Sequence, residues 1–156
     1  MRKFLSKRKS ALVVGLILLA TNIDAGAILA REDTSAAKVE AQHILTSPLE
    51  GAPGKEVDIE IYTFPPGSSV PWHIHPDAHE FDHQIAGTLT LEVKGEPPRD
   101  LKAGDSIYLR PNVVHRGWNK STTETAKVYV VRIKPVGKPL TELIDPEAGA
   151  YPDAEP

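Results

Sequence analysis

Three histidines and one glutamate hold most of the chemistry in this sequence of 156 residues. His73 and His75 are two positions apart, so on a β-strand both imidazoles would lie on one face, because side chains alternate with a period of two. A short turn through residues 76–77 would return the chain as an antiparallel neighbour and place Glu80 beside the pair. His115, about 35 residues further on, offers a fourth donor. This set is typical of a metal site.

The donor types limit the metal that such a site would hold. Imidazole nitrogens and a carboxylate oxygen suit divalent iron, manganese, nickel, cobalt, copper or zinc, and we expect iron or manganese. The chain has no cysteine, which excludes a disulfide, a zinc–thiolate site, an iron–sulfur cluster and a thiol nucleophile. Four protein ligands on a metal that prefers six would leave two positions open.

Short strands are the elements that must position these residues. Proline and glycine recur so often after residue 36 that we expect no long helix, because proline removes a hydrogen-bond donor and clashes inside a helix. Runs rich in β-branched and alternating residues instead predict strands. The expected strands are residues 57–64, 70–75, 80–85, 88–93, 106–109, 113–118 and 127–133.

The alternation within these strands predicts which side packs inward. In the first strand, Val57, Ile59 and Ile61 alternate with polar residues, so we expect the apolar face to pack inward and the other face to stay polar. The strand at 88–93 repeats this pattern, and Gly95 after it predicts a hairpin turn, since glycine adopts positive φ at little cost. Many short alternating strands with regular turns indicate a sandwich or a small barrel.

The spacing of the site residues resembles that of the cupin family. The family's first motif, G-x5-H-x-H-x4-E-x6-G, is matched in full, and its second, G-x5-P-x-G-x2-H-x3-N, at three positions. The matching residues are Gly67, His73, His75, Glu80 and Gly87 in the first motif and Gly104, His115 and Asn119 in the second. Two positions depart from the second motif, because Pro111 stands one place late and Asn112 occupies the glycine position. Asparagine tolerates positive φ, so we expect the turn to be kept.

This resemblance covers about Val57 to Ile133 and implies an all-β, antiparallel jelly-roll barrel with a metal inside. It also implies a homodimer, and it implies that the metal ligands are His73, His75, Glu80 and His115. The expected organisation is an N-terminal segment at 1–30, an N-terminal arm with a first strand at 31–55, the barrel at 56–135 and a C-terminal tail at 136–156.

The first 30 residues are expected to be a cleavable signal peptide. Five cations precede the apolar run at 11–20, and small residues follow it. Ten apolar residues fall short of the roughly 20 needed to span a bilayer. Cleavage after Ala27 or Ala30 would leave 13 basic and 20 acidic side chains, a net charge of −7. We therefore expect an acidic, periplasmic or secreted domain that has no membrane partner after cleavage and no nucleic-acid partner.

Other candidate site residues follow from position and residue type. Alternation from Glu80 places Asp82 and Gln84 on the same inward face, so Asp82 is a candidate catalytic group for proton transfer and Gln84 a candidate neighbour of the ligands. The alternative for Asp82 is an ordinary hydrogen-bonded strand carboxylate. Tyr62 and Trp72 are candidates to line a pocket, and core packing is the alternative for both.

Three functions remain open, all with a small molecule as partner. The first is a metal-dependent oxidoreductase resembling the quercetin-dioxygenase-like cupins, in which Glu80 or Asp82 takes a proton from a hydroxylated or enolised substrate. The second is non-redox metal chemistry, such as isomerisation, decarboxylation or lyase chemistry on a sugar acid or keto acid. The third is a periplasmic module that binds a metal or ligand without turnover. The sequence carries no substrate signature that decides among them.

Overall fold

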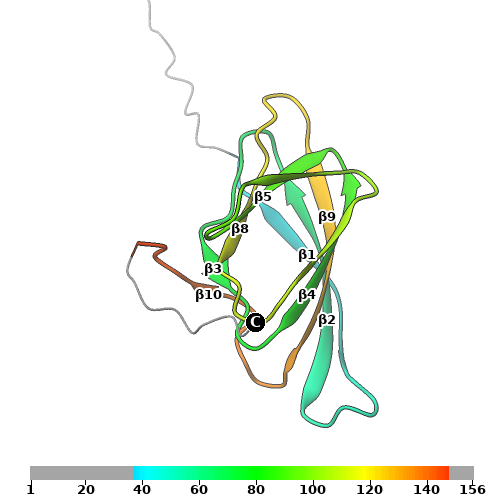
Figure 1. Ribbon diagram of the computed structural model, residues 1–156. Helices are drawn as coiled ribbons and strands as arrows, with labels where there is room; N and C mark the ends of the chain where they lie inside the picture. Colours follow the sequence, from blue (N-terminus) through cyan, green and yellow to red (C-terminus); the bar gives the residue numbers. More distant parts are fainter. Residues whose placement is uncertain (1–36, 148–156) are drawn as a thin grey trace, which may run out of the picture. The chain divides into compact units, whose positions relative to one another are not determined.

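The computed structural model describes residues 37–147, which form ten strands and no helix (Figure 1). Within that range, therefore, no helix is long and apolar enough to cross a membrane. The expected signal peptide at 1–30 and its cleavage sites lie outside the described residues. The strands are β1 (Glu40–Pro48), β2 (Lys55–Phe64), β3 (His73–Ile74), β4 (His79–Ala86), β5 (Thr88–Val93), β6 (Arg99–Lys102), β7 (Ser106–Leu109), β8 (His115–Trp118), β9 (Ala126–Pro135) and β10 (Glu142–Leu143).

The strands form two antiparallel sheets of five. Sheet A has the order β1-β2-β9-β4-β7, and sheet B has the order β10-β3-β8-β5-β6. Sequence neighbours often lie in different sheets, as β3 and β4 do, which is the connectivity of a jelly roll. Figure 1 shows β3, β8 and β5 on one side of the interior and β2, β9 and β4 on the other. The expectation of an all-β antiparallel jelly roll is confirmed.

The expected strands mostly match the observed ones. β5 and β7 have the expected bounds, and β2, β4 and β9 contain the expected ranges. The expectation of a strand at 70–75 is wrong over most of its length, because only His73–Ile74 is paired as a strand, and β8 begins two residues later than expected. β6 and β10 were not expected, since each is short and carries a single apolar residue.

The hairpin between β5 and β6 has the turn that glycine predicted. Gly95 has φ 82°, and the N–H of Glu96 donates to the carbonyl of Val93 at 3.0 Å. Asn112 likewise has φ 62°, so the turn before the third histidine is kept without a glycine. Gly87 cannot be replaced in the same way, because a Cβ there would lie 2.4 Å from the carbonyl oxygen of Thr125.

The alternation in β2 faces the opposite way from the expectation. Asp58 and Glu60 point into the interior and are 6% and 8% exposed. The apolar residues that were expected inside lie half-buried on the outer face: Val57, Ile59 and Ile61. Alternation identifies two faces but not which one is interior. Arg132 and Lys134 of the neighbouring β9 decide it, because they form ion pairs with Glu60 and Glu56 inside the molecule.

Apolar side chains fill the rest of the interior in two clusters. Phe64, Leu89, Ala126, Val128 and Val130 form one cluster, and Leu91, Leu101 and Leu109 form the other. The inward alternation expected for β5 is confirmed, since Leu89 and Leu91 are 3% and 4% exposed. These clusters line the interior beside its polar end.

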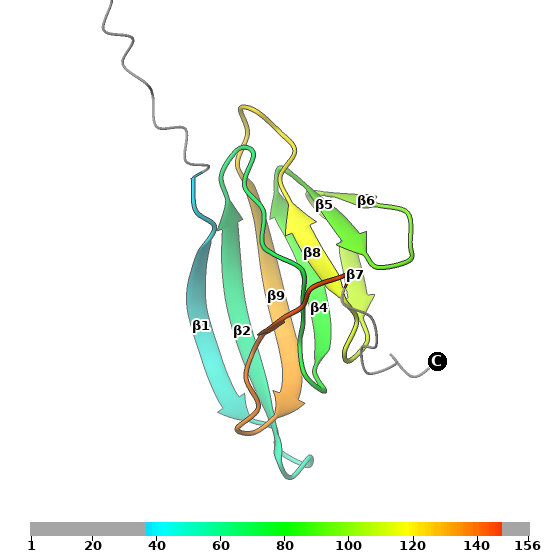
Figure 2. The same ribbon diagram turned by 90° about the vertical axis from the view of Figure 1, so that its left-hand side faces the viewer.

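Residues 136–147 return across the interior after β9. Figure 2 shows this segment crossing in front of β9 and β4. β10 then pairs with β3, and the N–H of Ile144 donates to the carbonyl of Trp72 at 2.9 Å. The end of the described chain is thereby attached to the strand that carries the first histidine.

Candidate metal centre

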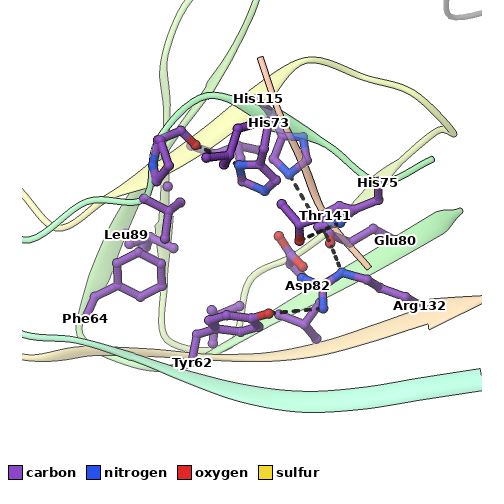
Figure 3. Close-up of a pocket in the computed structure, with 17 residues that line it drawn as sticks. Tyr62, Phe64, His73, His75, Glu80, Asp82, Leu89, His115, Arg132 and Thr141 are labelled. Carbon is purple, nitrogen blue, oxygen red and sulfur yellow. Dashed lines mark hydrogen bonds and ion pairs between the residues drawn. The ribbon is translucent and has the colours of Figure 1, made fainter. Parts of the chain in front are cut away.

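The three histidines converge inside the barrel on one end of sheet B. His73 of β3 and His115 of β8 are paired directly across the ladder, and His75 follows two residues after His73. The rings are 3–8% exposed, and one nitrogen of each lies within 4.8 Å of the others. Figure 3 shows the rings directed towards Glu80.

Backbone carbonyls hold each ring in one orientation. A carbonyl oxygen only accepts, so each Nδ1 carries the proton and each Nε2 of a neutral ring offers its lone pair. This is the arrangement by which histidine ligands are oriented in metal sites. The pairs are His73 with Pro71 at 2.8 Å, His115 with Val113 at 2.8 Å and His75 with Leu140 at 2.5 Å.

Glu80 reaches the histidines from the opposite sheet. The expected return of the chain as an antiparallel neighbour of the histidine strand is wrong, because β3 pairs with β8 and β10 whereas β4 pairs with β9 and β7. The connection crosses between the sheets through Asp77, which has φ 55°. Glu80 nevertheless lies beside the rings. Its Oε2 is 2.8 Å from His75 Nε2, and its Oε1 is 3.2 Å from His115 Nε2.

The contact between His75 and Glu80 fits a bound cation. Among the described residues, the buried Nε2 of His75 has no hydrogen-bond partner, although Glu80 Oε2 is 2.8 Å away. Because Nδ1 carries the proton, two lone pairs face each other, and an ion between them would satisfy both. Nitrogen and oxygen donors of this kind suit a divalent transition metal.

His73 is kept neutral by its surroundings. Burial, followed by the nearby rings of His115 and His75, lowers the pKa of His73 to about 3. A neutral imidazole is the form that binds metal. His73 therefore presents a ligand rather than a proton donor at neutral pH.

Arg132 is a site residue that the sequence analysis missed. Its Nε donates to Glu80 Oε2 at 2.5 Å, and its Nη1 donates to Glu60 Oε2 at 2.8 Å. The Tyr62 hydroxyl also donates to Glu60. Extending the period-two pattern along β9, from Val128 through Val130 to position 132, could have placed this arginine inside.

This network sets the charge of Glu80. Burial opposes ionisation of the carboxyl, but Arg132 and the neighbouring histidines outweigh it and hold the pKa of Glu80 well below its usual range. Burial also opposes the charge on Arg132, and the carboxylate of Glu80 outweighs this and raises the pKa of the guanidinium. Both groups are charged in the folded protein.

The alternation expected from Glu80 is confirmed along β4, and it brings Asp82 into the cavity. Asp82 is 8% exposed, and its Oδ1 has no hydrogen-bond partner within residues 37–147. Burial, and then the charge of Glu80, raise the pKa of Asp82 well above its usual value. Gln84 is fully buried beyond the cavity, where its Nε2 donates to the carbonyl of Ala86 at 2.7 Å.

The two candidate aromatic residues lie in different places. Tyr62 lines the cavity beside Arg132, and burial raises the pKa of its hydroxyl. Trp72 lies outside the cavity, where its ring is 4.9 Å from the guanidinium carbon of Arg116. The side chain before the first histidine therefore faces away from the site.

The cavity beside the histidines has a volume of about 160 Å³. Its polar end is formed by the histidines, Glu80, Asp82 and Arg132. Thr141 and Leu143 from the returning C-terminal segment complete the wall. The apolar end is formed by Phe64, Val70, Leu89, Leu91, Val128 and Val130. A cavity of this size holds a molecule of about one six-membered ring.

Comparisons with known proteins agree on the fold. The model of the Cupin domain family matches residues 60–132. A Cupin 2 conserved barrel domain protein from Salinispora arenicola is 28% identical, with a TM-score of 0.50 over 60% of this chain and 74% of that chain. An uncharacterised protein with a double-stranded beta-helix domain from Klebsiella pneumoniae is 20% identical, with a TM-score of 0.57 over 71% and 88%.

An enzyme also shares the fold. The DMSP lyase DddQ from Ruegeria pomeroyi is 24% identical, with a TM-score of 0.50 over 60% of this chain. The match spans 45% of the length of that lyase. A search of curated proteins finds no match. These likenesses support the architecture, and the chemistry has to be argued from the site itself.

Proposed function

The chain is a small cupin-domain protein, and from this premise we propose that it is a metal-dependent oxidoreductase that acts on a small organic molecule. The observation that carries the proposal is the buried histidine cluster facing a carboxylate at the end of an apolar cavity. His73, His75, His115 and Glu80 would hold the ion, with iron or manganese as the expected metals. Such an ion would supply a Lewis acid for a substrate oxygen and a redox centre for dioxygen chemistry.

Charge balance in the cavity favours a substrate that binds as a monoanion. Glu80 and Glu60 offset Arg132 and leave one negative charge. A divalent ion would change this to one positive charge while Asp82 is protonated. An enolate or a singly ionised catechol would neutralise the site. Its apolar part would pack against the opposite end of the cavity, where Phe64 and Leu89 exclude water.

Asp82 is the residue best placed to exchange a proton with such a substrate. It lines the cavity two residues from Glu80, and burial and the charge of Glu80 raise the pKa of its carboxyl well above the usual value. A raised pKa makes a carboxylate a stronger base towards a substrate proton. Glu80 is the weaker base of the two, because Arg132 holds its negative charge.

Oxygen uptake would test the proposal. Protein reconstituted with iron or manganese would be supplied with acetylacetone, catechol and a flavonol, and dioxygen consumption would be recorded. We expect uptake with the small diketone or the catechol, and a large loss of it in Asp82→Asn. The matched control is His83→Ala, which alters an exposed side chain on the same strand. No uptake with any substrate and either metal would contradict the proposal.

Two further measurements separate the other functions. Product formation under strict anaerobiosis, or with zinc in place of iron, would identify non-redox chemistry. A thermal shift with substrate but no product would identify a binding module.

We further propose that the protein is exported. The basic, apolar and small-residue order of the first 30 residues supports this. Cell fractionation followed by sequencing of the mature N-terminus would test it, and we expect the first residue to be Ile28 or Arg31. Retention of Met1 in the cytoplasm would contradict it.

A further inference from the structure

The opening of the cavity lies beside the C-terminal segment 138–144. Of the 17 described residues that line the cavity, three are exposed to solvent: Pro71, Thr141 and Leu143. Pro71 precedes β3, and the other two belong to the C-terminal segment, which crosses here after β9 (Figure 2). A molecule that enters the cavity on this side therefore passes between Pro71 and the segment.

Contacts at both ends hold the C-terminal segment in place. At its start, the Lys138 ammonium is 3.4 Å from Asp77 Oδ2, and the Lys134 ammonium donates to the Lys138 carbonyl at 2.9 Å. At its end, β10 pairs with β3, and the N–H of Ile144 donates to the carbonyl of Trp72 at 2.9 Å. The two residues at the opening are thus held by contacts that do not involve their own side chains, which leaves these side chains for a ligand.

Thr141 brings a hydroxyl group to the polar end of the cavity. Its Oγ1 is 3.5 Å from His75 Nδ1, and Figure 3 shows it beside that ring. His75 Nδ1 donates its proton to the carbonyl of Leu140 at 2.5 Å, so towards this nitrogen the hydroxyl is an acceptor. The hydroxyl proton is not used in that contact, and a hydroxyl rotates to suit its partner. The Thr141 hydroxyl is therefore available to donate to a ligand in the cavity.

Leu143 brings an apolar side chain to the same opening. It is 68% exposed although it lines the cavity, so most of its surface is in contact with water. A ligand whose apolar part reaches the opening would cover this side chain, and removing the apolar area from water is favourable. The cavity has a volume of about 160 Å³, so a ligand much larger than one ring would collide with Leu143 as it protrudes.

We propose that Thr141 and Leu143 select the substrate at the opening of the cavity. The Thr141 hydroxyl donates a hydrogen bond to the charged oxygen of a monoanion, and Leu143 covers its apolar ring. Hydrogen bonds to charged groups are stronger than those between neutral groups, so the hydroxyl favours an oxyanion over a neutral ligand. The class of substrate rests on the proposed function. The selected molecule is a one-ring monoanion such as a catecholate, and a flavonol with several rings is disfavoured.

Ligand binding to the zinc-loaded protein tests the role of Thr141 without turnover. The probe is 4-nitrocatechol, whose visible absorbance changes when it ionises or binds a metal, so a titration gives its dissociation constant. Thr141→Val removes the hydroxyl at nearly constant shape and should raise this constant about tenfold, whereas Thr141→Ser keeps the hydroxyl and should stay within about threefold of the wild type. Thr88→Val is the matched control, because Thr88 is exposed on β5 and does not line the cavity. Zinc content should be equal in all of these proteins.

Leu143→Ala tests the selection by size. It should weaken 4-nitrocatechol binding about threefold, because less apolar area is covered, and it should strengthen the binding of a flavonol, because the opening is wider. The ratio of the two dissociation constants should therefore change about tenfold. Val136→Ala is the matched control and should leave the ratio unchanged, since Val136 is also an exposed apolar residue, at 57%, but does not line the cavity.

These binding results separate the selection of substrate from the oxidoreductase chemistry. The selection is overturned by a Thr141→Val variant that binds 4-nitrocatechol like the wild type, by a Thr141→Ser variant as weak as Thr141→Val, or by an unchanged ratio in Leu143→Ala. A zinc-loaded wild type that binds neither ligand overturns it as well. Failure of the oxidoreductase proposal appears instead as normal binding to the zinc protein without dioxygen consumption by the iron or manganese protein.

Discussion

The inner face of sheet A carries many ionisable side chains and its outer face carries large apolar ones. In most soluble β-sandwiches the inner faces are apolar and the outer faces polar. The inner face buries six ionisable side chains, each less than 9% exposed: Asp58, Glu60, Glu80, Asp82, Arg132 and Lys134. The outer face exposes large apolar residues, among them Phe81, Ile85 and Tyr108, to more than 40%. Side chains are usually arranged the other way.

This difference indicates that the inner face does not only pack as an apolar core and that the outer face is not suited only to contact with water. Buried charges are tolerated only when they are paired, and Arg132 joins Glu80 to Glu60 for that reason. The histidine lone pairs that remain next to Glu80 suit a cation. The outer face, in contrast, gains free energy when apolar area leaves water. Substitutions can test the two faces separately.

Removing Arg132 should have the largest effect on folding. Arg132→Met would leave two buried carboxylates without their partner, which costs about 3–5 kcal/mol in the free energy of unfolding. The control is Arg116→Met. Arg116 pairs with Glu92 in sheet B and its side chain is 30% exposed, so its loss should cost less than about 1 kcal/mol. Urea unfolding of metal-free protein measures both, and equal losses would contradict the idea that the inner face depends on this arginine.

Removing a histidine ligand should weaken metal binding more than it destabilises the fold. His115→Ala deletes one donor of the buried cluster, and we expect metal affinity to fall at least about 100-fold, roughly 2.7 kcal/mol. Elemental analysis after dialysis against a weak chelator measures it. His79→Ala and His83→Ala change histidines on the outer side of sheet A and should retain wild-type stoichiometry. Equal metal contents in all variants would exclude the proposed centre.

Asp82 should make the stability of the folded protein depend on pH. Its folded pKa is raised well above the usual value by burial and by Glu80, so the folded state binds its proton more tightly than the unfolded state. Metal-free protein should therefore lose stability as pH rises above about 4, through the folded pKa of Asp82. Asp82→Asn cannot ionise, so its stability advantage over the wild type should grow with pH in that window. A constant difference between pH 4 and 8 would rule out this assignment.

Residue types and spacing predicted the site better than they predicted the faces of the sheet. The four expected ligands meet because His73 and His75 are two residues apart, because β3 pairs directly with β8, and because β4 brings Glu80 into the interior from the opposite sheet. β2 was assigned the wrong inner face, because alternation is symmetric and the deciding partner, Arg132, lies about 70 residues away. Arg132 itself was missed since a lone arginine on a strand has no local signature of burial. β10 was not expected, because a strand of two residues forms only through its pairing with β3.

The smallest effect should come from a pair of adjacent residues on opposite faces. Val130 is 3% exposed in the core, whereas Val131 lies half-buried on the outer face. Val130→Thr puts a hydroxyl in the apolar cluster and should cost about 1–3 kcal/mol. Val131→Thr on the outer face should cost less than about 0.5 kcal/mol.

Urea unfolding of the two valine variants measures both costs. If Val131→Thr destabilises the protein as much as Val130→Thr does, the outer face behaves as part of the core. The distinction between the two faces of sheet A would then fail, because the outer apolar residues would be packed as tightly as the inner ones.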